Sequence, residues 1–368
     1  MNAILGRRIS AFETVVFTAA MTFAAGIFLA PRILVADAGR GGGLALLGAF
    51  ILMVAWASAL SRLADRLPHR AIAQAAVRRL PYVGYPWLGL VVLMELVIAS
   101  GALTAYQAMI TAVAMPGFPP MAISTLLVLG AWTGARHRLE GLARAVVVFF
   151  GAFATLGLLS FLLLLMRGTE LAAVLPTADV SAGAILRADL DTMFLYGGFG
   201  ALALSLPYQV RRRRGLPYAA IGVMVTGALT LLAYIVTVGT VGPAYVLLTT
   251  WPTVSALRTL VLHSFFLDRF GLVMVFAWSA IVIAYVSIHL WAAAEAACQI
   301  TGTERGRGWW ALSFSAALLL MSSMSGGPMQ EESMARGLEG PVSAALLVGW
   351  LLAAAALALF ARREPAAA

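Results

Sequence analysis

Residues 190–207 read LDTMFLYGGFGALALSLP, an apolar stretch that Gly197, Gly198 and Gly200 interrupt in the middle. Each glycine costs a helix roughly 1 kcal/mol relative to alanine, so three glycines within four positions favour local unwinding. Unwound backbone has unpaired amide and carbonyl groups, which a membrane tolerates only inside protein or around a cavity. Such a break is a place where a polar ligand can bind. The alternative interpretation is that the glycines let helices pack closely.

The composition is typical of a polytopic membrane protein. Of the 368 residues, 62% are hydrophobic and 11% are charged, and the mean hydropathy is +0.93. The formal charge of +9 comes from arginine without lysine. Arginine at helix ends explains this charge better than a nucleic-acid partner does. The single cysteine excludes an internal disulfide framework. Because the four histidines are far apart along the sequence, we expect no metal site, and we expect no cofactor.

The apolar segments predict about ten transmembrane helices in a single membrane domain, residues 1–368. We expect them over residues 10–34, 44–63, 86–113, 121–133, 145–166, 190–207, 218–238, 272–297, 309–324 and 342–361. Residues 71–77 can form an interfacial helix. Residues 167–189 read as a long connection, and residues 242–270 as a partly helical external loop.

The arginines predict the orientation of these helices. With both termini in the cytoplasm, the internal segments contain 18 arginines, namely residues 7, 8, 62, 66, 70, 78, 79, 136, 138, 144, 211, 212, 213, 214, 305, 307, 362 and 363. The external segments contain the other 7, which are residues 32, 40, 167, 187, 258, 269 and 336. Because basic residues are enriched in cytoplasmic loops, this distribution supports an integral membrane protein with cytoplasmic termini.

A second interruption is expected in helix 1, between Ala24 and Pro31, because small residues are followed there by a proline. Breaks in helices 1 and 6 occupy corresponding positions in a five-plus-five inverted repeat. The first repeat would span residues 10–166, and the second would comprise helices 6 to 9 over residues 184–324 and helix 10 over 341–362. Paired breaks of this kind indicate a transporter-type site at mid-membrane. Half-helix ends can bind both a carboxylate and an ammonium group, so a small amphoteric ligand is expected.

Several motifs occur in an order that resembles a known family. They are Gly141-Leu142-Ala143-Arg144, Leu175-Pro176, Tyr196-Gly197-Gly198-Phe199, Trp251-Pro252-Thr253, Ser264-Phe265-Phe266-Leu267-Asp268-Arg269-Phe270 and Trp278. From about Ile9 to Arg362, the chain resembles the spore germination permeases, the B subunits of nutrient germinant receptors within the amino acid–polyamine–organocation superfamily. The resemblance implies the leucine-transporter fold, a location in the spore inner membrane and the sensing of a nutrient such as an amino acid. It also implies two partners, an A subunit with membrane helices and a lipoprotein C subunit.

Within this fold, the ligand site is expected at the two breaks and on helices 3 and 8. The candidate residues are Thr22, Ala25 and Gly26 on helix 1, Glu95, Ser100 and Thr104 on helix 3, Gly197, Gly198 and Phe199 on helix 6, and Tyr285, Ser287 and His289 on helix 8. The glycines would offer backbone groups to the ligand, and Phe199 would form a lid. For each side chain taken singly, helix packing or a hydrogen bond to its own backbone is the alternative role.

The charged residues within or beside the helices have two interpretations each. An intramembrane carboxylate is a functional hypothesis by default, and Glu95 could carry a coupling proton or bind the amine of the ligand. Glu295 lies near the cytoplasmic end of helix 8, where pairing with a loop arginine predicts a structural role. The run Arg211–Arg214 is interpreted as a topology determinant that contacts anionic lipid, with docking of a partner as the alternative.

Two functions from different classes remain open. One is a receptor subunit that binds a nutrient and transmits a conformational change to partner chains, and the other is a proton-coupled amino acid transporter that acts alone. Sodium-coupled members of this fold place two neighbouring hydroxyl residues on helix 8, whereas Val286 and Ile288 flank Ser287 here. The oxygen ligands for sodium are therefore too few, so sodium coupling is not expected and a receptor is favoured. A lysine on helix 5, which replaces the ion in some relatives, is missing too. The sequence shows no nucleophile–base pair that would indicate an enzyme.

Overall fold

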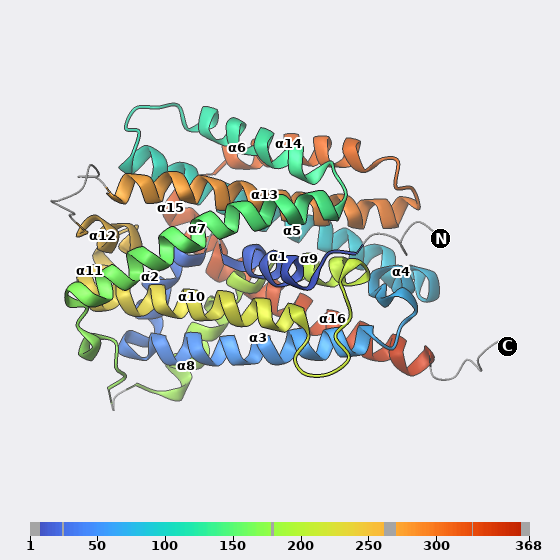
Figure 1. Cartoon of the computed structure of the whole chain (residues 1–368), viewed down its shortest axis with the longest axis horizontal. Coiled ribbons are helices and arrows are strands. Elements are labelled where there is room, and N and C mark those ends of the chain that lie inside the picture. The colour runs from blue at the N-terminus through green and yellow to red at the C-terminus, as the bar shows by residue number, and fades with distance from the viewer. Residues whose placement is uncertain (1–7, 24–25, 178–179, 261–269, 326, 362–368) are drawn as a thin grey trace.

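The protein is described by a computed structural model that covers residues 8–361 except 24–25, 178–179, 261–269 and 326. The described residues form helices, and the one backbone bridge among them joins Ile9 to Gln209. The helices are α1 Ala11–Phe23, α2 Gly26–Ala38, α3 Gly42–Ala64, α4 Ile72–Arg79, α5 Pro81–Val113, α6 Pro120–Ala135, α7 Leu139–Gly168, α8 Ala182–Asp191, α9 Phe199–Ser205, α10 Tyr218–Val241, α11 Pro243–Leu248, α12 Pro252–Arg258, α13 Phe270–Thr301, α14 Arg307–Ser323, α15 Pro328–Met334 and α16 Gly340–Ala361. The long helices lie side by side along the long axis of the molecule (Figure 1).

Within the described residues, six helical stretches are long and apolar enough to cross a membrane. The first, residues 29–64, runs α2 and α3 together, although a 3₁₀ turn at Gly39–Gly41 separates them. Three shorter helical segments are also apolar, namely α1, α6 and the second half of helix 6. Together these elements account for nine of the ten expected spans. The remaining span, predicted over residues 309–324, corresponds to α14, a 17-residue helix. The interfacial helix predicted at residues 71–77 is α4. The predicted external loop contains α11 and α12.

The structure describes helix 1 as two elements, α1 and α2, which meet at the start of the predicted interval Ala24–Pro31. α1 ends at Phe23 and α2 begins at Gly26, while Ala24 and Ala25 lie outside the described residues. Pro31 lies inside α2. A proline removes only its own amide donor from the helix, and α2 continues past it to Ala38.

Helix 6 is broken at the predicted glycines but begins earlier than predicted. Its first half is α8, in the segment interpreted as a connection, followed by a 3₁₀ turn over Met193–Tyr196 and then α9. Ser181 caps α8, because its hydroxyl accepts a hydrogen bond from the amide of Ala184 at 3.1 Å. The charged residues Arg187 and Asp189 interrupt the apolar pattern of α8, and this is why hydropathy alone misses it.

Helix 10 also begins earlier than predicted. α15 is followed directly by a π-helical turn, Ala335–Glu339, and then by α16. The predicted span, residues 342–361, therefore misses the N-terminal part of helix 10, which consists of α15 and the π-turn. A π-turn places one extra residue in a helical turn, and such turns are frequent at functional sites.

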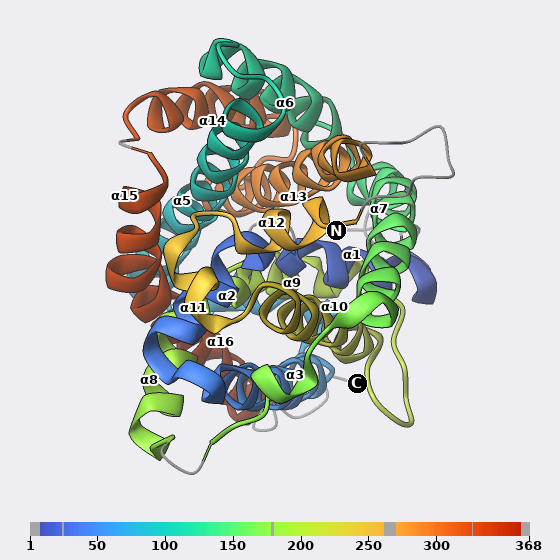
Figure 2. The same cartoon turned by 90° about the vertical axis from the view of Figure 1, so that its left-hand side faces the viewer.

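The broken helices lie near the middle of the bundle. In the view from one end, α1, α2 and α9 occupy its centre, with α3, α5, α7, α13 and α16 around them (Figure 2). α13 is the most enclosed of the six membrane-length stretches, since 94% of its apolar window is buried. Side chains from α5 and α13 can therefore reach the two breaks.

Segments predicted to be cytoplasmic meet at one end of the bundle. Glu13 of α1 forms an ion pair with Arg144 of α7 at 3.6 Å. Arg62, at the end of α3, donates a hydrogen bond to the carbonyl oxygen of Arg212 at 3.1 Å. α4 lies at this end too, while α8, α11 and α12 lie at the opposite end (Figure 1).

Candidate ligand-binding site between the broken helices

The glycine turn of helix 6 lies directly against α1 and α13. A Cβ atom added to Gly198 would come within 2.6 Å of the carbonyl oxygen of Met21 and 2.9 Å of Cε1 of His289. A Cβ atom added to Gly197 would approach Ile98 of α5 and lie 3.0 Å from Oγ of Ser343. Glycine is thus required for close approach at the break, so the packing interpretation holds at these positions and does not exclude a ligand at the neighbouring backbone.

A buried pair, Glu95 and His289, joins α5 to α13 behind this turn. Their Oε2 and Nδ1 atoms are 2.6 Å apart, and the side chains are 2% and 0% exposed. The other carboxylate oxygen, Oε1, lies where a Cβ atom of Gly200 would be, and the backbone of Ala201 also hydrogen-bonds to the carboxylate. Glu95 therefore ties the first turn of α9 to the centre of the bundle.

The second nitrogen of His289, Nε2, is buried and has no hydrogen-bond partner among the described residues. It lies 3.4 Å from the position that a Cβ atom of Gly198 would occupy, so this polar atom faces the break. The ring of Tyr285 packs against the imidazole with centroids 4.2 Å apart. A ligand group or a water molecule at the break could satisfy Nε2.

The other hydroxyl candidates on helices 1 and 3 are buried. Thr22 donates a hydrogen bond to the carbonyl oxygen of Ala19 at 3.3 Å. Thr104 is 2% exposed, and its hydroxyl has no hydrogen-bond partner among the described residues. Ser100 is 8% exposed on the same helix. Of these three, Thr104 has a polar group left for a ligand or water.

Phe199 and Ser287 face neighbouring helices. Phe199 stacks on Trp56 of α3 at 4.7 Å and on Tyr196 at 5.9 Å between ring centroids. Ser287 donates a hydrogen bond to the carbonyl oxygen of Ile283 at 2.6 Å and packs where a Cβ atom of Gly134 would be. Of the remaining two candidates, Ala25 lies outside the described residues, and Gly26 is the first residue of α2.

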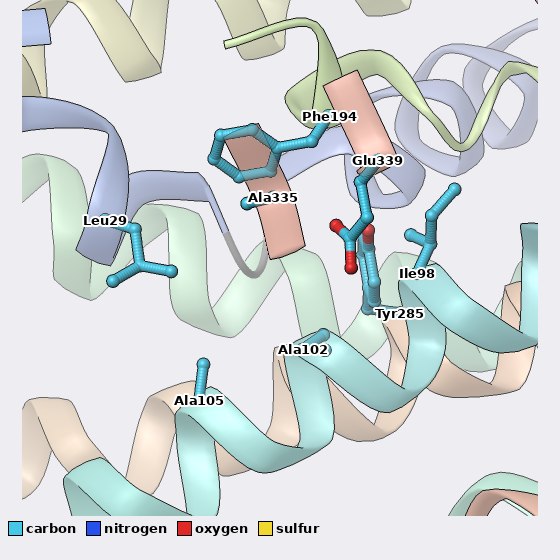
Figure 3. A pocket seen from close by; sticks show the side chains of 9 residues that line it. Leu29, Ile98, Ala102, Ala105, Phe194, Tyr285, Ala335 and Glu339 are labelled. Atoms are coloured by element: carbon cyan, nitrogen blue, oxygen red, sulfur yellow. The ribbon is translucent and has the colours of Figure 1, made fainter. Parts of the chain in front are cut away.

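A small cavity lies beside the breaks, and Glu339 of the π-turn reaches it (Figure 3). Its volume is about 20 Å³, enough for roughly one water molecule. The lining residues are Leu29, Ile98, Gly101, Ala102, Ala105, Phe194, Tyr285, Ala335 and Glu339. Sequence reasoning did not select Glu339, because it placed this residue in a loop before helix 10. The signal that could have pointed to it was a carboxylate three residues before the expected helix.

An ion-pair cluster lies next to this cavity, toward the end of the bundle opposite the loops that are predicted to be cytoplasmic. Arg336 contacts Asp37 at the end of α2 at 2.7 Å, Asp191 at the end of α8 at 3.4 Å and Glu332 of α15 at 3.3 Å. Glu332 also pairs with Arg32 of α2 at 3.4 Å. The cluster therefore connects α2 of helix 1 and α8 of helix 6 to helix 10.

At the opposite end, Glu295 forms an ion pair with Arg307, as the structural interpretation predicts. Glu295 also accepts a hydrogen bond from Tyr208 at 3.2 Å. The loop that carries Arg211–Arg214 is fixed by Arg62, which donates hydrogen bonds to its backbone carbonyls. Arg211, Arg213 and Arg214 are exposed there.

Comparison with known families identifies the chain. The family model for the spore germination protein matches residues 8–328, most of the sequence. The chain belongs to the spore germination protein family. The resemblance of its motifs to spore germination permeases is thereby confirmed. Comparison with curated protein sequences finds no match.

Solved structures show that this family member has the leucine-transporter fold. The structure of MhsT in complex with L-phenylalanine is similar with a TM-score of 0.65 and 15% identity, over 97% of this chain and 98% of that chain. The nucleobase-cation-symport-1 family transporter Mhp1, in a closed conformation with bromovinylhydantoin bound, gives a TM-score of 0.58 and 15% identity, over 98% and 93%. The expected all-helical fold with broken helices 1 and 6 is confirmed. The boundaries assigned to the two repeats stay a prediction.

Proposed function

We propose that this protein is the nutrient-sensing membrane subunit of a spore germinant receptor. A small amphoteric nutrient, with an amino acid as the first candidate, binds between the broken helices 1 and 6. The protein lies in the spore inner membrane with both termini in the cytoplasm. Binding changes its conformation, and germinant-receptor A and C subunits receive this change. Family membership and the permease-type fold support the proposal.

Two observations carry this proposal: the glycine turn of helix 6 packs against α1 at Met21, and Leu29 of α2 and Phe194 of the turn before α9 line one water-sized cavity. A nutrient larger than a water molecule must separate the elements that line the cavity. A ligand that binds the opened arrangement better shifts the protein toward it, by the difference in affinity for the two states. Ligand binding and movement of α2, α8 and helix 10 are therefore coupled.

The ends of the broken helices suit an amphoteric ligand. α2 is a 13-residue helix whose first amides are directed toward the break, and its dipole favours an anionic group there. The unpartnered Nε2 of His289 and the hydroxyl of Thr104 add polar contacts. Apart from Glu339 and the hydroxyl of Tyr285, the side chains that line the cavity are aliphatic or aromatic, which suits an apolar side chain.

The second candidate function is a proton-coupled amino acid transporter that acts alone. The pair Glu95–His289 favours it, because a carboxylate and an imidazole 2.6 Å apart can share or exchange a proton inside the bundle. Since Glu95 also contacts the first turn of α9, protonation of the pair would act on the helix 6 break.

Ligand screening followed by reconstitution tests the proposal. Amino acids, nucleosides and sugars are tested for a shift in the melting temperature of the purified protein, and the strongest binder is then offered in labelled form to liposomes containing it. A receptor is expected to bind this compound without concentrating it, and to co-purify with co-expressed A and C subunits. Uptake driven by a proton gradient would instead establish the transporter.

A further inference from the structure

The two ring nitrogens of His289 have different surroundings. Nδ1 lies 2.6 Å from Oε2 of Glu95, and both side chains are buried. Nε2 is buried as well, but it has no hydrogen-bond partner among the described residues. A buried polar atom without a protein partner is uncommon, and a ligand or a proton that binds there is one reason for a protein to keep it.

The number of protons on the pair Glu95–His289 decides what Nε2 can do. Without a proton, Oε2 and Nδ1 each present only a lone pair, so the contact between them requires one proton. With this single proton on the pair, Nε2 keeps its own lone pair and accepts a hydrogen bond. The carboxylate is already engaged by the backbone of Ala201, and its Oε1 packs against Gly200. A second proton therefore goes to Nε2, which then donates.

The groups around Nε2 favour a positively charged partner. The carbonyl oxygen of Met21 lies in the last turn of α1, and it is 2.6 Å from the position that a Cβ atom of Gly198 would occupy. Nε2 is 3.4 Å from the same position. The C-terminal end of a helix dipole favours a cation. The titratable groups that face the pair are Tyr285 on α13 and, beyond its ring at the cavity, Glu339 of the π-turn.

We propose that the ammonium group of the nutrient and a proton compete for Nε2 of His289, so that each nutrient molecule that binds releases one proton. This inference rests on the proposed function, because it takes the nutrient site to lie at the two breaks. An ammonium group offers only donors, and Nε2 accepts from it only while the pair carries a single proton. The second proton leaves Nε2 for the solvent, and an N–H group of the ammonium takes its place. Glu95 is the positioning residue, since it fixes Nδ1 and its charge stabilises the imidazolium.

The competition gives the pH dependence a definite sign. At a pH low enough for the pair to carry two protons, the nutrient must displace one of them, so its affinity rises about tenfold for each unit of pH increase. At a higher pH, Nε2 is already an acceptor and the affinity is constant. A transporter that takes up a proton together with its substrate requires the opposite sign. The proton count therefore also separates the two candidate functions.

Isothermal titration calorimetry on the purified full chain counts these protons. The probes are alanine, valine, leucine and phenylalanine, each with the amine that remains without its carboxylate. Each probe is titrated in buffers of different ionisation enthalpy, at pH values from about 5.5 to 8, the range in which histidine titrates. The part of the heat that varies with the buffer gives the number of protons released. We expect at least one amino acid and its amine to bind, each with release of about one proton at the lower pH values.

Four variants locate the exchanging proton. Glu95→Gln still accepts a hydrogen bond from Nδ1, so it should bind the probe, but without the carboxylate charge the release should fall to about zero. His289→Gln should abolish the release as well. Glu339→Gln should keep it, because the proton is exchanged at the pair. His137→Gln, at an exposed position before α7, is the matched control and should also keep it.

A probe that binds without proton release at every pH, or with proton uptake, would overturn the inference and leave the proposed nutrient site standing. Release that persists in Glu95→Gln and disappears in Glu339→Gln would overturn it too, because the exchange would then occur at Glu339. Binding of nucleosides or sugars without any amine would have the same consequence. If none of these compounds binds, the inference and the proposed function both fail. If a variant does not fold, shown by its melting temperature without probe, the proton count of the wild type still decides.

Discussion

Glu95 is the residue whose role can be tested most simply, because its carboxylate contacts both His289 and the first turn of α9. Glu95→Gln keeps an oxygen that can accept a hydrogen bond from Nδ1, whereas Glu95→Ala leaves the buried imidazole without this partner. An unsatisfied buried polar group costs about 1–3 kcal/mol. We expect Glu95→Ala to lower the melting temperature and abolish the nutrient response, and Glu95→Gln to retain much of both. Glu170→Ala is the control, and an unchanged Glu95→Ala variant would reduce Glu95 to a packing role.

Sequence reasoning could identify Glu95, because a carboxylate inside an apolar run is conspicuous. It could not identify the contact with His289, since 194 residues separate the two positions along the chain. Glu339 was missed for a different reason. The π-turn extends helix 10 beyond its apolar part, and no local pattern predicts that turn. Ser287 and Phe199 have suitable chemistry and depth, but the helix rotation that directs them to other helices depends on packing.

The break of helix 6 can be tested as an element. Gly198→Ala would bring a methyl group within 2.6 Å of the Met21 carbonyl, so α1 or the turn must shift. Overpacking of this kind costs about 1–3 kcal/mol. Gly151→Ala in α7 is the matched control, since a Cβ atom there has nothing within 4 Å and alanine favours a helix. We expect a lower melting temperature for Gly198→Ala and an equal or higher one for Gly151→Ala. Equal melting temperatures for wild type and Gly198→Ala would contradict the close approach.

The ion-pair cluster around Arg336 makes a second prediction for the broken helices. Arg336→Gln removes three contacts that join α2, α8 and α15. At about 0.5 kcal/mol for each of the three partly exposed pairs, the end of the bundle that carries the cluster should open roughly tenfold more often. The rate at which an impermeant thiol reagent modifies Ala105→Cys, in a Cys298→Ser background, should rise accordingly. Arg40→Gln, on an exposed residue, should leave the rate unchanged. No increase with Arg336→Gln would show that the cluster does not restrict access.

At the scale of the molecule, hydropathy and arginine placement predicted the number of spans and the grouping of the loops. They did not predict α8, where charged residues mask a helix. Orientation can be tested directly in intact cells. Cysteines placed in the Arg211–Arg214 loop should resist an impermeant thiol reagent, while cysteines in the connection over residues 167–181 should react. Reaction of the Arg211–Arg214 loop from outside would reverse the proposed orientation.

Protection of a single cysteine in the cavity tests most directly whether the nutrient binds between the broken helices. Ala102→Cys, in a Cys298→Ser background, places a thiol in the cavity wall, and Met224→Cys on α10 places one on the outside of the bundle as a control. The nutrient with the largest thermal shift should slow modification of Ala102→Cys about tenfold at saturation and leave Met224→Cys unchanged. If that nutrient binds with measurable affinity and both thiols react at the same rates with and without it, the ligand site is not between the broken helices.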